Sequence, residues 1–252
     1  MIDKLKPAAI VLQETKLYKK GTLKFDEYDS FESVRGTGEG GGLVSLIHKK
    51  LNPVEIPIES DSKSSENIIV VEADIGKERV RTINGYGPQE YAQFDQKIGF
   101  FSLLDEQIQS AIDDGKYCCV QMDGNGKFGG SIIPGDSHKQ TNNGKLLLDI
   151  ITRKNLRLVN GTSKCKGKIT RTRKVEDKVE ESTIDFFFVC QGLYKWIDSM
   201  LIDEERKYSF KKYTRTKQQI VRVTESDHNV LILFLKYKFN NKIKPSREEI
   251  FN

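Results

Sequence analysis

The sequence predicts a mixed α/β domain with more than one layer of β-sheet. Runs of strand length, either wholly apolar or alternating with polar residues, outnumber the segments with helical spacing along the 252 residues. The helical segments fall between strands, which is typical of α/β rather than all-β proteins. Neither an internal repeat nor a low-complexity linker interrupts this order. We therefore expect one domain over residues 1–239, followed by a polar linker or tail over 240–252.

The first strand of this domain is expected over residues 8–12, a continuous apolar run after Pro7. A second is expected over 43–47, directly after the glycine-rich segment 35–42. Glycine-rich loops that bind phosphate lead into the N-terminus of a helix. Because a strand follows here, we interpret 35–42 as a flexible loop.

A strand pair and a helix are expected next. Residues 67–75 and 79–84 are strand-like and are separated by a short turn that contains Gly76. Residues 90–113 have helical spacing, and Gly115 marks the end of the helix. The apolar residues expected to share its buried face are Phe94, Ile98, Phe101, Leu104, Ile108 and Ile112.

The second half of the chain continues the alternation of strands and helices. A helix is expected over 142–154. The strands are expected over 117–122, 156–159, 169–170, 182–190, 196–202 and 229–239.

The composition excludes some classes of protein. Hydrophobic residues make up 37% and charged residues 31%, and no run reaches the roughly 18 apolar residues of a membrane span. The N-terminus has no apolar core of the secretory type, so we expect an intracellular protein without a membrane partner. None of the four cysteines has CxxC spacing, which favours reduced thiols over a structural zinc site.

Basic residues gather in two segments, over 164–178 and 206–222, although the net charge is only +5. Solvated loops explain many such runs, and a surface for a polyanion such as nucleic acid explains them equally well. Aromatic residues interleave with the second segment, which favours nucleic acid. These aromatic residues are Tyr208, Phe210 and Tyr213.

Short polar motifs at the ends of strand-like runs carry the candidate chemistry. They are Gln13-Glu14-Thr15, Asn84-Gly85-Tyr86-Gly87-Pro88, Asp123-Gly124-Asn125, Ile184-Asp185 and Ser226-Asp227-His228. Together they supply carboxylates, an amide, a phenol and an imidazole. Phosphodiester cleavage needs neutralised phosphoryl charge, an aligned water and a stabilised leaving group. The motifs therefore predict a metal-dependent phosphodiesterase.

Glu14 and Asp227 are the candidate metal ligands. Both end apolar segments, where a fixed backbone can aim a carboxylate, and hard oxygen donors suit Mg²⁺. Taken alone, Glu14 would be an ordinary solvated acid at a strand end. The metal hypothesis depends on the accompanying motifs.

Asp123 and Asn125 are the candidate groups for handling water or the leaving group. In an extended backbone, residues two apart face the same side, so an acid and an amide would lie together. The alternative is a simple turn, since Asp-Gly and Asn-Gly sequences both form turns.

His228 is the candidate phosphate-binding imidazole. An acid that orients it and favours its positive charge would let it stabilise the transition state. Asp185 is the predicted orienting acid, because an acid beside three phenylalanines needs a partner if it is buried. In isolation His228 would be a surface histidine, as we expect for His48 and His138.

The ordered motifs resemble those of the exonuclease–endonuclease–phosphatase family, whose fold resembles pancreatic deoxyribonuclease, over most of residues 8–238. Within this family, several short segments of the sequence are most similar to the endonuclease domains of non-LTR retrotransposons. The segments that carry this second resemblance are Tyr86-Gly87-Pro88-Gln89-Glu90, Met122-Asp123-Gly124-Asn125-Gly126-Lys127, Asn143-Gly144-Lys145-Leu146-Leu147, Ile169-Thr170-Arg171-Thr172-Arg173 and Glu225-Ser226-Asp227-His228-Asn229. Residues 247–252 resemble the start of the connection to a reverse transcriptase in such polyproteins. The resemblance implies two mixed β-sheets packed face to face with helices on the outside, a four-layer α/β/β/α sandwich.

The resemblance also implies a function. The expected activity is Mg²⁺-dependent nicking of double-stranded DNA, with Mn²⁺ as a possible substitute, leaving a 3′-hydroxyl that primes reverse transcription. Tyr86 would contact the scissile phosphate. The expected partners are double-stranded DNA and a reverse transcriptase domain of a parent polyprotein, and the expected place of action is the nucleus. The candidate nucleic-acid-binding residues are Lys168, Thr170, Arg171 and Arg173.

The sequence departs from the family pattern at three places. The family begins with a further strand that carries an asparagine near the metal, well before the glutamate, and Glu14 lies too close to Met1 for such a strand. We therefore expect a sheet one strand short and a metal shell without that amide. Phe186 stands for the usual tyrosine, and Gly126 for the usual alanine.

Three alternatives stay open. The chain could be a DNA-binding remnant without catalysis, an abasic-site repair nuclease, or a phosphodiesterase for a small or lipid substrate. The basic segments and the lack of secretory features count against the last of these.

Overall fold

The computed structural model describes residues 5–17, 19–34, 41–59, 63–208, 211–215 and 220–236, with only the backbone of 211–215 and 220–225. The predictions for most of the glycine-rich loop and for the 240–252 tail, including the resemblance over 247–252, lie outside these residues. The chain divides into two compact units. Unit 1 comprises residues 1–86, 98–121 and 236–252, and unit 2 comprises 87–97 and 122–235.

Unit 1 contains two antiparallel sheets. The first joins β1 (Ala9–Gln13), β3 (Leu43–His48) and β2 (Tyr28–Ser33), with β3 in the centre. In the second, β4 (Val54–Glu55), β5 (Ile68–Ile75) and β6 (Glu78–Tyr86) form antiparallel pairs, and the sheet continues from β6 to β7 (Tyr117–Asp123). Short 3-10 helices, η1 (Lys49–Leu51) and η2 (Lys63–Asn67), lie in the connections. The predicted strands over 8–12, 43–47, 67–75 and 79–84 are confirmed, and β2 was not predicted.

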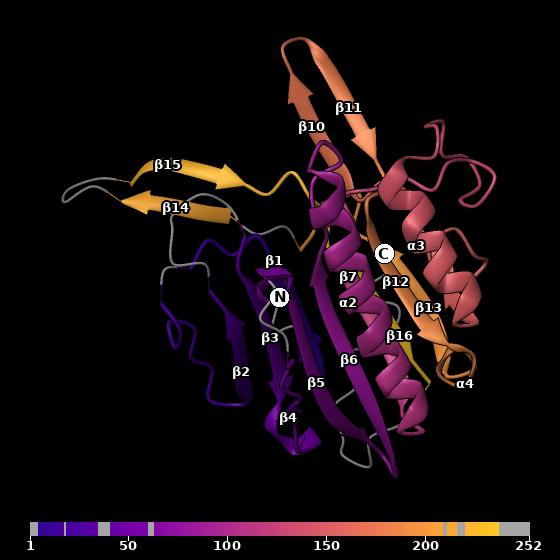
Figure 1. Ribbon diagram of the computed structural model, residues 1–252. Coiled ribbons are helices and arrows are strands. Elements are labelled where there is room, and N and C mark those ends of the chain that lie inside the picture. Colours follow the sequence, from indigo (N-terminus) through magenta and orange to yellow (C-terminus); the bar gives the residue numbers. More distant parts are fainter. Residues whose placement is uncertain are drawn as a thin grey trace. The chain divides into compact units, whose positions relative to one another are not determined.

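The two sheets of unit 1 enclose an apolar core, and α2 (Phe94–Asp113) covers the far face of the second sheet (Figure 1). The core cluster contains Leu43, Ile47, Leu51, Ile69, Val71, Ala73 and Tyr86. On the helix side, Arg81 of β6 donates to Ser110 and Asp114 near the end of α2, at 2.9 and 2.6 Å.

The predicted helix exists, but it begins at Phe94 rather than at residue 90, and its buried face is shifted. The side chain of Phe94 is 71% exposed, and Ile98 and Ile112 are more than one third exposed. The buried positions include Phe101, Leu104 and Ile108 as predicted, and also Phe100, Leu103 and Ala111. Periodicity alone could not decide which neighbouring apolar residues face the sheet.

Unit 2 is built around β12 (Asp185–Cys190), which pairs with β8 (Leu156–Leu158). The strand β7 (Tyr117–Asp123) begins in unit 1 and ends in unit 2. A further sheet places β13 (Ile197–Ile202) between antiparallel β16 (Leu231–Leu235) and parallel β9 (Cys165–Lys166). The helices are α3 (Asn142–Arg153) and the short α4 (Gln191–Tyr194).

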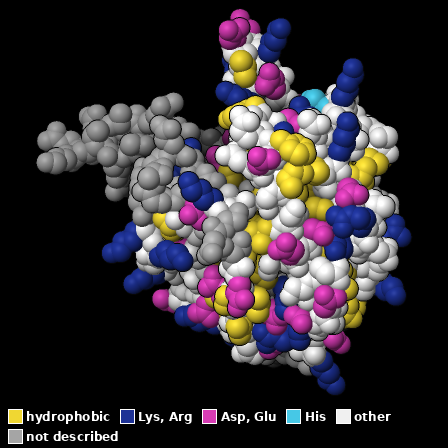
Figure 2. Space-filling view, viewed as in Figure 1, with side chains coloured by type: hydrophobic (Ala, Val, Ile, Leu, Met, Phe, Trp, Pro, Cys, Tyr) yellow, Lys and Arg dark blue, Asp and Glu magenta, His cyan; other side chains and the backbone are white. Residues whose placement is uncertain are grey.

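Two hairpins complete unit 2: β10 (Arg171–Val175) with β11 (Lys178–Ser182), and β14 (Lys211–Arg215) with β15 (Ile220–Glu225). The expected strand over 169–170 is wrong, because strand pairing begins at Arg171 instead. Basic and acidic side chains stand together on the β10–β11 hairpin (Figure 2). Without apolar alternation, this segment gave no strand signal.

No helix among the residues described by the structure is long and apolar enough to cross a membrane. The described cysteines are all free thiols, and burial raises the pKa of Cys165. The prediction of reduced thiols is therefore consistent with the fold.

Asn84 links the sheets of unit 1 although its side chain is fully buried. Its Nδ2 donates to the Val44 carbonyl at 3.0 Å and to Ser45 Oγ at 3.2 Å, and its Oδ1 accepts from Gln13 Nε2 at 2.8 Å. A buried amide that makes its hydrogen bonds stabilises the folded state. If the amide is removed, its former partners stay buried without hydrogen bonds, which costs free energy.

Replacing Asn84 by alanine should therefore lower the free energy of unfolding by about 2–4 kcal/mol, since several buried groups lose their partners together. Urea denaturation followed by circular dichroism measures this change. Gln96→Ala, at an exposed position of α2, serves as the matched control. An equal midpoint for the two variants would show that the buried amide does not hold the sheets.

Candidate active site

Glu14 and Tyr86 lie together in unit 1. β1 ends at Gln13, and Glu14 follows in the left-handed region with φ of 51°. Tyr86 is the last residue of β6, and its hydroxyl donates to Glu14 Oε1. The bond orients a carboxylate at the end of a fixed strand, as the metal hypothesis requires of Glu14.

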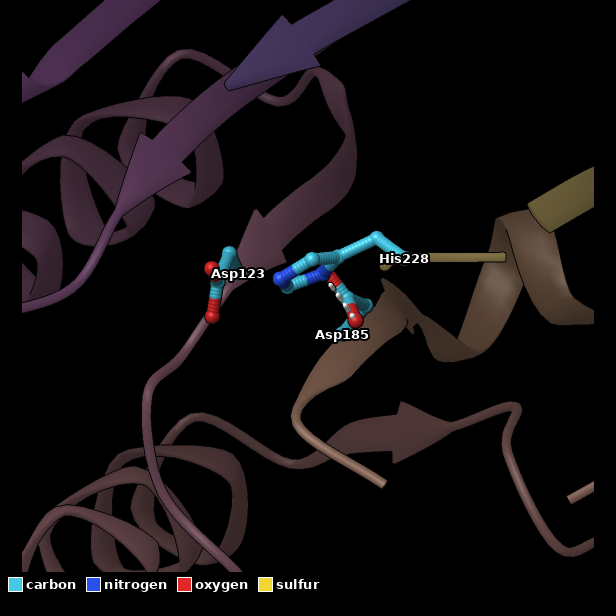
Figure 3. A group of neighbouring side chains, drawn as sticks. All are labelled: Asp123, Asp185 and His228. Carbon is cyan, nitrogen blue, oxygen red and sulfur yellow. Dashed lines mark hydrogen bonds and ion pairs between the residues drawn. The ribbon is translucent and has the colours of Figure 1, made fainter. Parts of the chain in front are cut away.

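His228 and two aspartates form a cluster in unit 2. The Nδ1 atom of His228 lies 3.0 Å from both carboxylate oxygens of Asp185, which confirms the predicted pairing. Figure 3 shows the ring between two carboxylates, with Asp185 on its Nδ1 side and Asp123 facing its other edge. The side chain of His228 is 27% exposed and that of Asp185 is 13% exposed, so water screens the pair only in part.

The carboxylates around His228 favour the protonated form of its imidazole ring. Burial by itself would lower the pKa of His228, but the Asp185 carboxylate, followed by Asp123 and Asp227, outweighs burial and raises that pKa to about 9. His228 is therefore an imidazolium at neutral pH, with Nδ1 donating to Asp185. The opposite edge of the ring can donate to an anion such as a phosphate oxygen.

Asp227 contacts the first residue of β10. Arg171 Nε donates to Asp227 Oδ2 at 2.9 Å, and Thr172 N donates to the Asp227 carbonyl at 2.8 Å. Burial alone would raise the pKa of Asp227, yet the charge of His228 and the bond from Arg171 lower it overall. The carboxylate thus stays ionised, as a cation ligand must.

Asp123 and Asn125 are joined by a turn rather than by extended backbone. Asn125 has φ of 44°, and its N–H donates to Asp123 Oδ1 at 2.9 Å. Of the two conformations that the sequence leaves open, the structure has the turn, which the side chain of Asp123 closes. The turn still keeps the acid and the amide together, and the amide Nδ2 donates to the Gly87 carbonyl at 2.9 Å.

Buried polar side chains fix the strand that carries Asp185. Thr170 Oγ1 accepts from the N–H groups of Ile184 and Asp185, at 2.9 and 3.1 Å. Asn160 accepts from Phe187 N at 2.9 Å and donates to the Asp185 carbonyl at 3.0 Å. Thr170 has no exposed surface, so the prediction that it contacts nucleic acid is corrected: it positions Asp185.

The remaining candidates for nucleic-acid contact are at the surface of unit 2. Lys168 is exposed, and its backbone N–H donates to Glu204. Arg173 is exposed on β10, opposite Glu180 of β11. Arg171 is less exposed and is paired with Asp227. The lysine and Arg173 are therefore placed to meet a polyanion, while Arg171 also orients a candidate metal ligand.

Asn125 and Arg171 both line a cleft of about 700 Å³ in unit 2. The cleft also reaches His138, whose Nδ1 lies 2.8 Å from Asp136 Oδ1. His138 was expected to be an ordinary surface residue, and no motif in the sequence indicated this aspartate partner. Such a space beside the cluster is large enough for part of a substrate.

The residues fit a hard divalent cation only in part. Asp123, Asp185 and His228 offer ligand atoms within 4.8 Å of one another. A metal-bound imidazole must be neutral at the ligating nitrogen, whereas His228 is protonated and its Nδ1 is bonded to Asp185. The ring nitrogen Nδ1 of this triad is therefore not available to a metal ion. The oxygen donors of Glu14 and Asp227, each oriented by a neighbour, have the chemistry that Mg²⁺ requires.

The positioning roles of several buried residues were not predicted. Asn84, Asn160 and Thr170 are buried and bonded to the strands that carry the candidates. Asn84 was expected only as the last residue of a strand, and nothing in the sequence around Asn160 indicated a role in the interior.

No protein-family model and no curated protein matches this sequence. Solved structures do. The endonuclease domain of TRAS1, a telomere-specific non-LTR retrotransposon, is 18% identical, with 92% of this chain and 87% of that chain covered and a TM-score of 0.64.

Two further structures show the same likeness. An AP endonuclease from Archaeoglobus fulgidus is 17% identical over 93% of this chain and 91% of its own, with a TM-score of 0.63. The 3′ phosphatase NExo from Neisseria, bound to a product DNA hairpin, is 15% identical over 92% and 90%, with a TM-score of 0.64. These matches confirm the predicted deoxyribonuclease-like α/β fold. The four-layer packing and the domain limits stay predictions.

Asp185→Asn should lower the pKa of His228 from about 9, because the largest effect that opposes burial is removed and only Asp123 and Asp227 still raise it. Histidine ring shifts followed by NMR across pH 5–10 in metal-free protein measure this. The wild-type pair should stabilise the fold fully below about pH 6.5 and lose its contribution as pH rises through about 9.

Asp136→Asn, which removes the partner of His138, is the matched control and should leave the titration of His228 in place. A His228 pKa that is equal in the wild type and in Asp185→Asn would contradict the proposed origin of its charge.

Proposed function

We propose that the chain is a metal-dependent DNA endonuclease that hydrolyses phosphodiester bonds. The observation that carries this proposal is the imidazole ring of His228, which Asp185 holds facing Asp123, while the backbone N–H of Asn125 donates to Asp123. A fixed cation beside a carboxylate and an oriented amide is suited to phosphoryl transfer, where charge must be stabilised and a water aligned.

Each group has a role that its contacts support. His228 donates from its Nε2 edge to a phosphate oxygen and stabilises the charge that develops there. Asp123 takes the proton of the attacking water or manages the leaving oxygen. Asn125, whose Nδ2 is bonded to Gly87, presents Oδ1 as the acceptor that orients the water. Asp185 positions and charges His228, and Tyr86 is assigned a phosphate contact from the sequence resemblance.

Mg²⁺, or Mn²⁺ in its place, would neutralise charge on the phosphoryl group when bound. Glu14 and Asp227 are the carboxylates proposed to hold it. Tyr86 orients the first and Arg171 the second. The lowered pKa of Asp227 keeps that ligand ionised.

Double-stranded DNA is the proposed substrate. Exposed cations at Lys168 and Arg173 and the cleft beside Asn125 support a polyanionic ligand. One solved structure with this fold is bound to product DNA, and another is a retrotransposon endonuclease domain. By analogy with the latter, we propose that the nick leaves a 3′-hydroxyl that primes reverse transcription, that a reverse transcriptase domain is the partner, and that the enzyme acts in the nucleus.

The purified chain should convert supercoiled plasmid to the nicked form with Mg²⁺, and EDTA should stop the reaction. Asp123→Ala and His228→Ala should each slow nicking by about 100-fold or more, because each removes a group that acts on the reacting phosphate. Gel electrophoresis of plasmid over time measures the rates, and His48→Ala provides a histidine control in unit 1.

Other outcomes identify the alternatives. Salt-sensitive DNA binding without nicking, unchanged by Asp123→Ala, would establish a DNA-binding remnant. Cleavage of abasic duplex with no cleavage of intact duplex would establish a repair nuclease. Turnover of inositol phosphates with an inert plasmid would establish a small-molecule phosphodiesterase.

A further inference from the structure

Asn143, in the first turn of α3, contacts two loops of unit 2 at once. Its side chain has no exposed surface. The Nδ2 group donates to the Pro88 carbonyl at 2.7 Å and to the Asn125 carbonyl at 3.0 Å, with the Gly124 carbonyl at 3.5 Å. One amide therefore ties α3 to the loop after Tyr86 and to the turn that carries Asn125.

The backbone packs closely around this amide, at positions where only glycine fits. A Cβ on Gly126 would lie 2.6 Å from Asn143 Cβ, and one on Gly144 would lie 2.0 Å from the Lys127 carbonyl oxygen. A Cβ on Gly87 would lie 2.7 Å from the Gly124 carbonyl oxygen. The glycines permit close approach, and the amide of Asn143 then fixes the loops at that distance.

Glu90 reinforces the same junction. Its carboxylate accepts the backbone N–H groups of Asn142 and Asn143 at 3.0 and 3.2 Å, at the positive end of α3. Lys97 donates to the carbonyl of Glu90 and lies 3.4 Å from its carboxylate. The loop is thereby held to the helix at both Pro88 and Glu90.

Only an amide at position 143 satisfies these carbonyls. An aspartate would bring its carboxylate oxygens against carbonyl oxygens, and a serine would be too short to reach both loops. Asn125 depends on this arrangement twice, through its own carbonyl and through its Nδ2 bond to Gly87. The direction of its Oδ1 therefore follows from where α3 holds the two loops.

We propose that Asn143 is a positioning residue for catalysis, which sets the orientation of the Asn125 amide without contacting substrate. This role rests on the proposed endonuclease function. A misplacement of about 1 Å at a reacting group can cost about 100-fold in rate. Asn143→Asp and Asn143→Ser should accordingly lower kcat by about 10- to 100-fold while KM for DNA changes less than about twofold, since the buried side chain is out of reach of DNA.

The test combines kinetics with hydrogen exchange. Single-turnover and steady-state nicking give kcat and KM for the wild type, Asn143→Asp, Asn143→Ser and the control Asn142→Ala, whose side chain is exposed in the same turn of α3. Melting curves confirm that each variant is folded. NMR hydrogen exchange then measures the protection of the Gly87 and Asn125 amides, and in the wild type also that of the Asn143 side-chain amide.

Loss of kcat at constant KM, with faster exchange at Gly87 and Asn125, supports the proposal, and Asn142→Ala should match the wild type. Unchanged kcat in folded Asn143 variants, or rapid exchange of the Asn143 amide in the wild type, would overturn it. If the wild type shows no nicking, the proposed function fails instead, and the exchange measurements still decide whether Asn143 holds the two loops.

Discussion

The ion pair between Asp185 and His228 is the interaction on which the chemistry of unit 2 depends. Two oxygens at 3.0 Å from Nδ1 fix the ring, and the carboxylate keeps it positive although burial opposes that charge. The same positive ring lowers the pKa of Asp227. The partly exposed carboxylate of Asp185 thus keeps a candidate phosphate-binding group charged and, through that group, lowers the pKa of a candidate metal ligand.

Neutral buried side chains hold the charged ones in place. Thr170 and Asn160 bind the strand that begins at Asp185, Asn143 binds the turn that carries Asn125, and Asn84 binds the strands that lead to Glu14 and Tyr86. Hydroxyls and amides suit this task because they satisfy backbone groups at a smaller desolvation cost than ions. Such side chains are needed at the ends of strands, because backbone N–H and C=O groups there have no neighbouring strand to pair with.

The sequence predicted the strands that are apolar and the residues that carry charge. The apolar run before Glu14 and the three phenylalanines after Asp185 each indicate a buried strand, and both lie in strands of the structure. The charged β10–β11 hairpin was not predicted because its strands bury few side chains and so have no apolar pattern. The buried face of α2 was predicted with an offset because Phe100 and Phe101 are consecutive apolar residues, and the spacing does not show which of them faces the sheet. Nothing in the sequence marks these asparagines as buried, so the groups that position the site could be found only once the tertiary structure showed their partners.

The pH dependence of single-turnover DNA nicking in wild type and Asp185→Asn tests the central claim most directly. If the imidazolium held by Asp185 stabilises the transition state, the rate should fall on the alkaline side near pH 9 in the wild type. In folded Asp185→Asn that fall should move to lower pH, together with the pKa of His228. Superimposable profiles for the two proteins would contradict the claim.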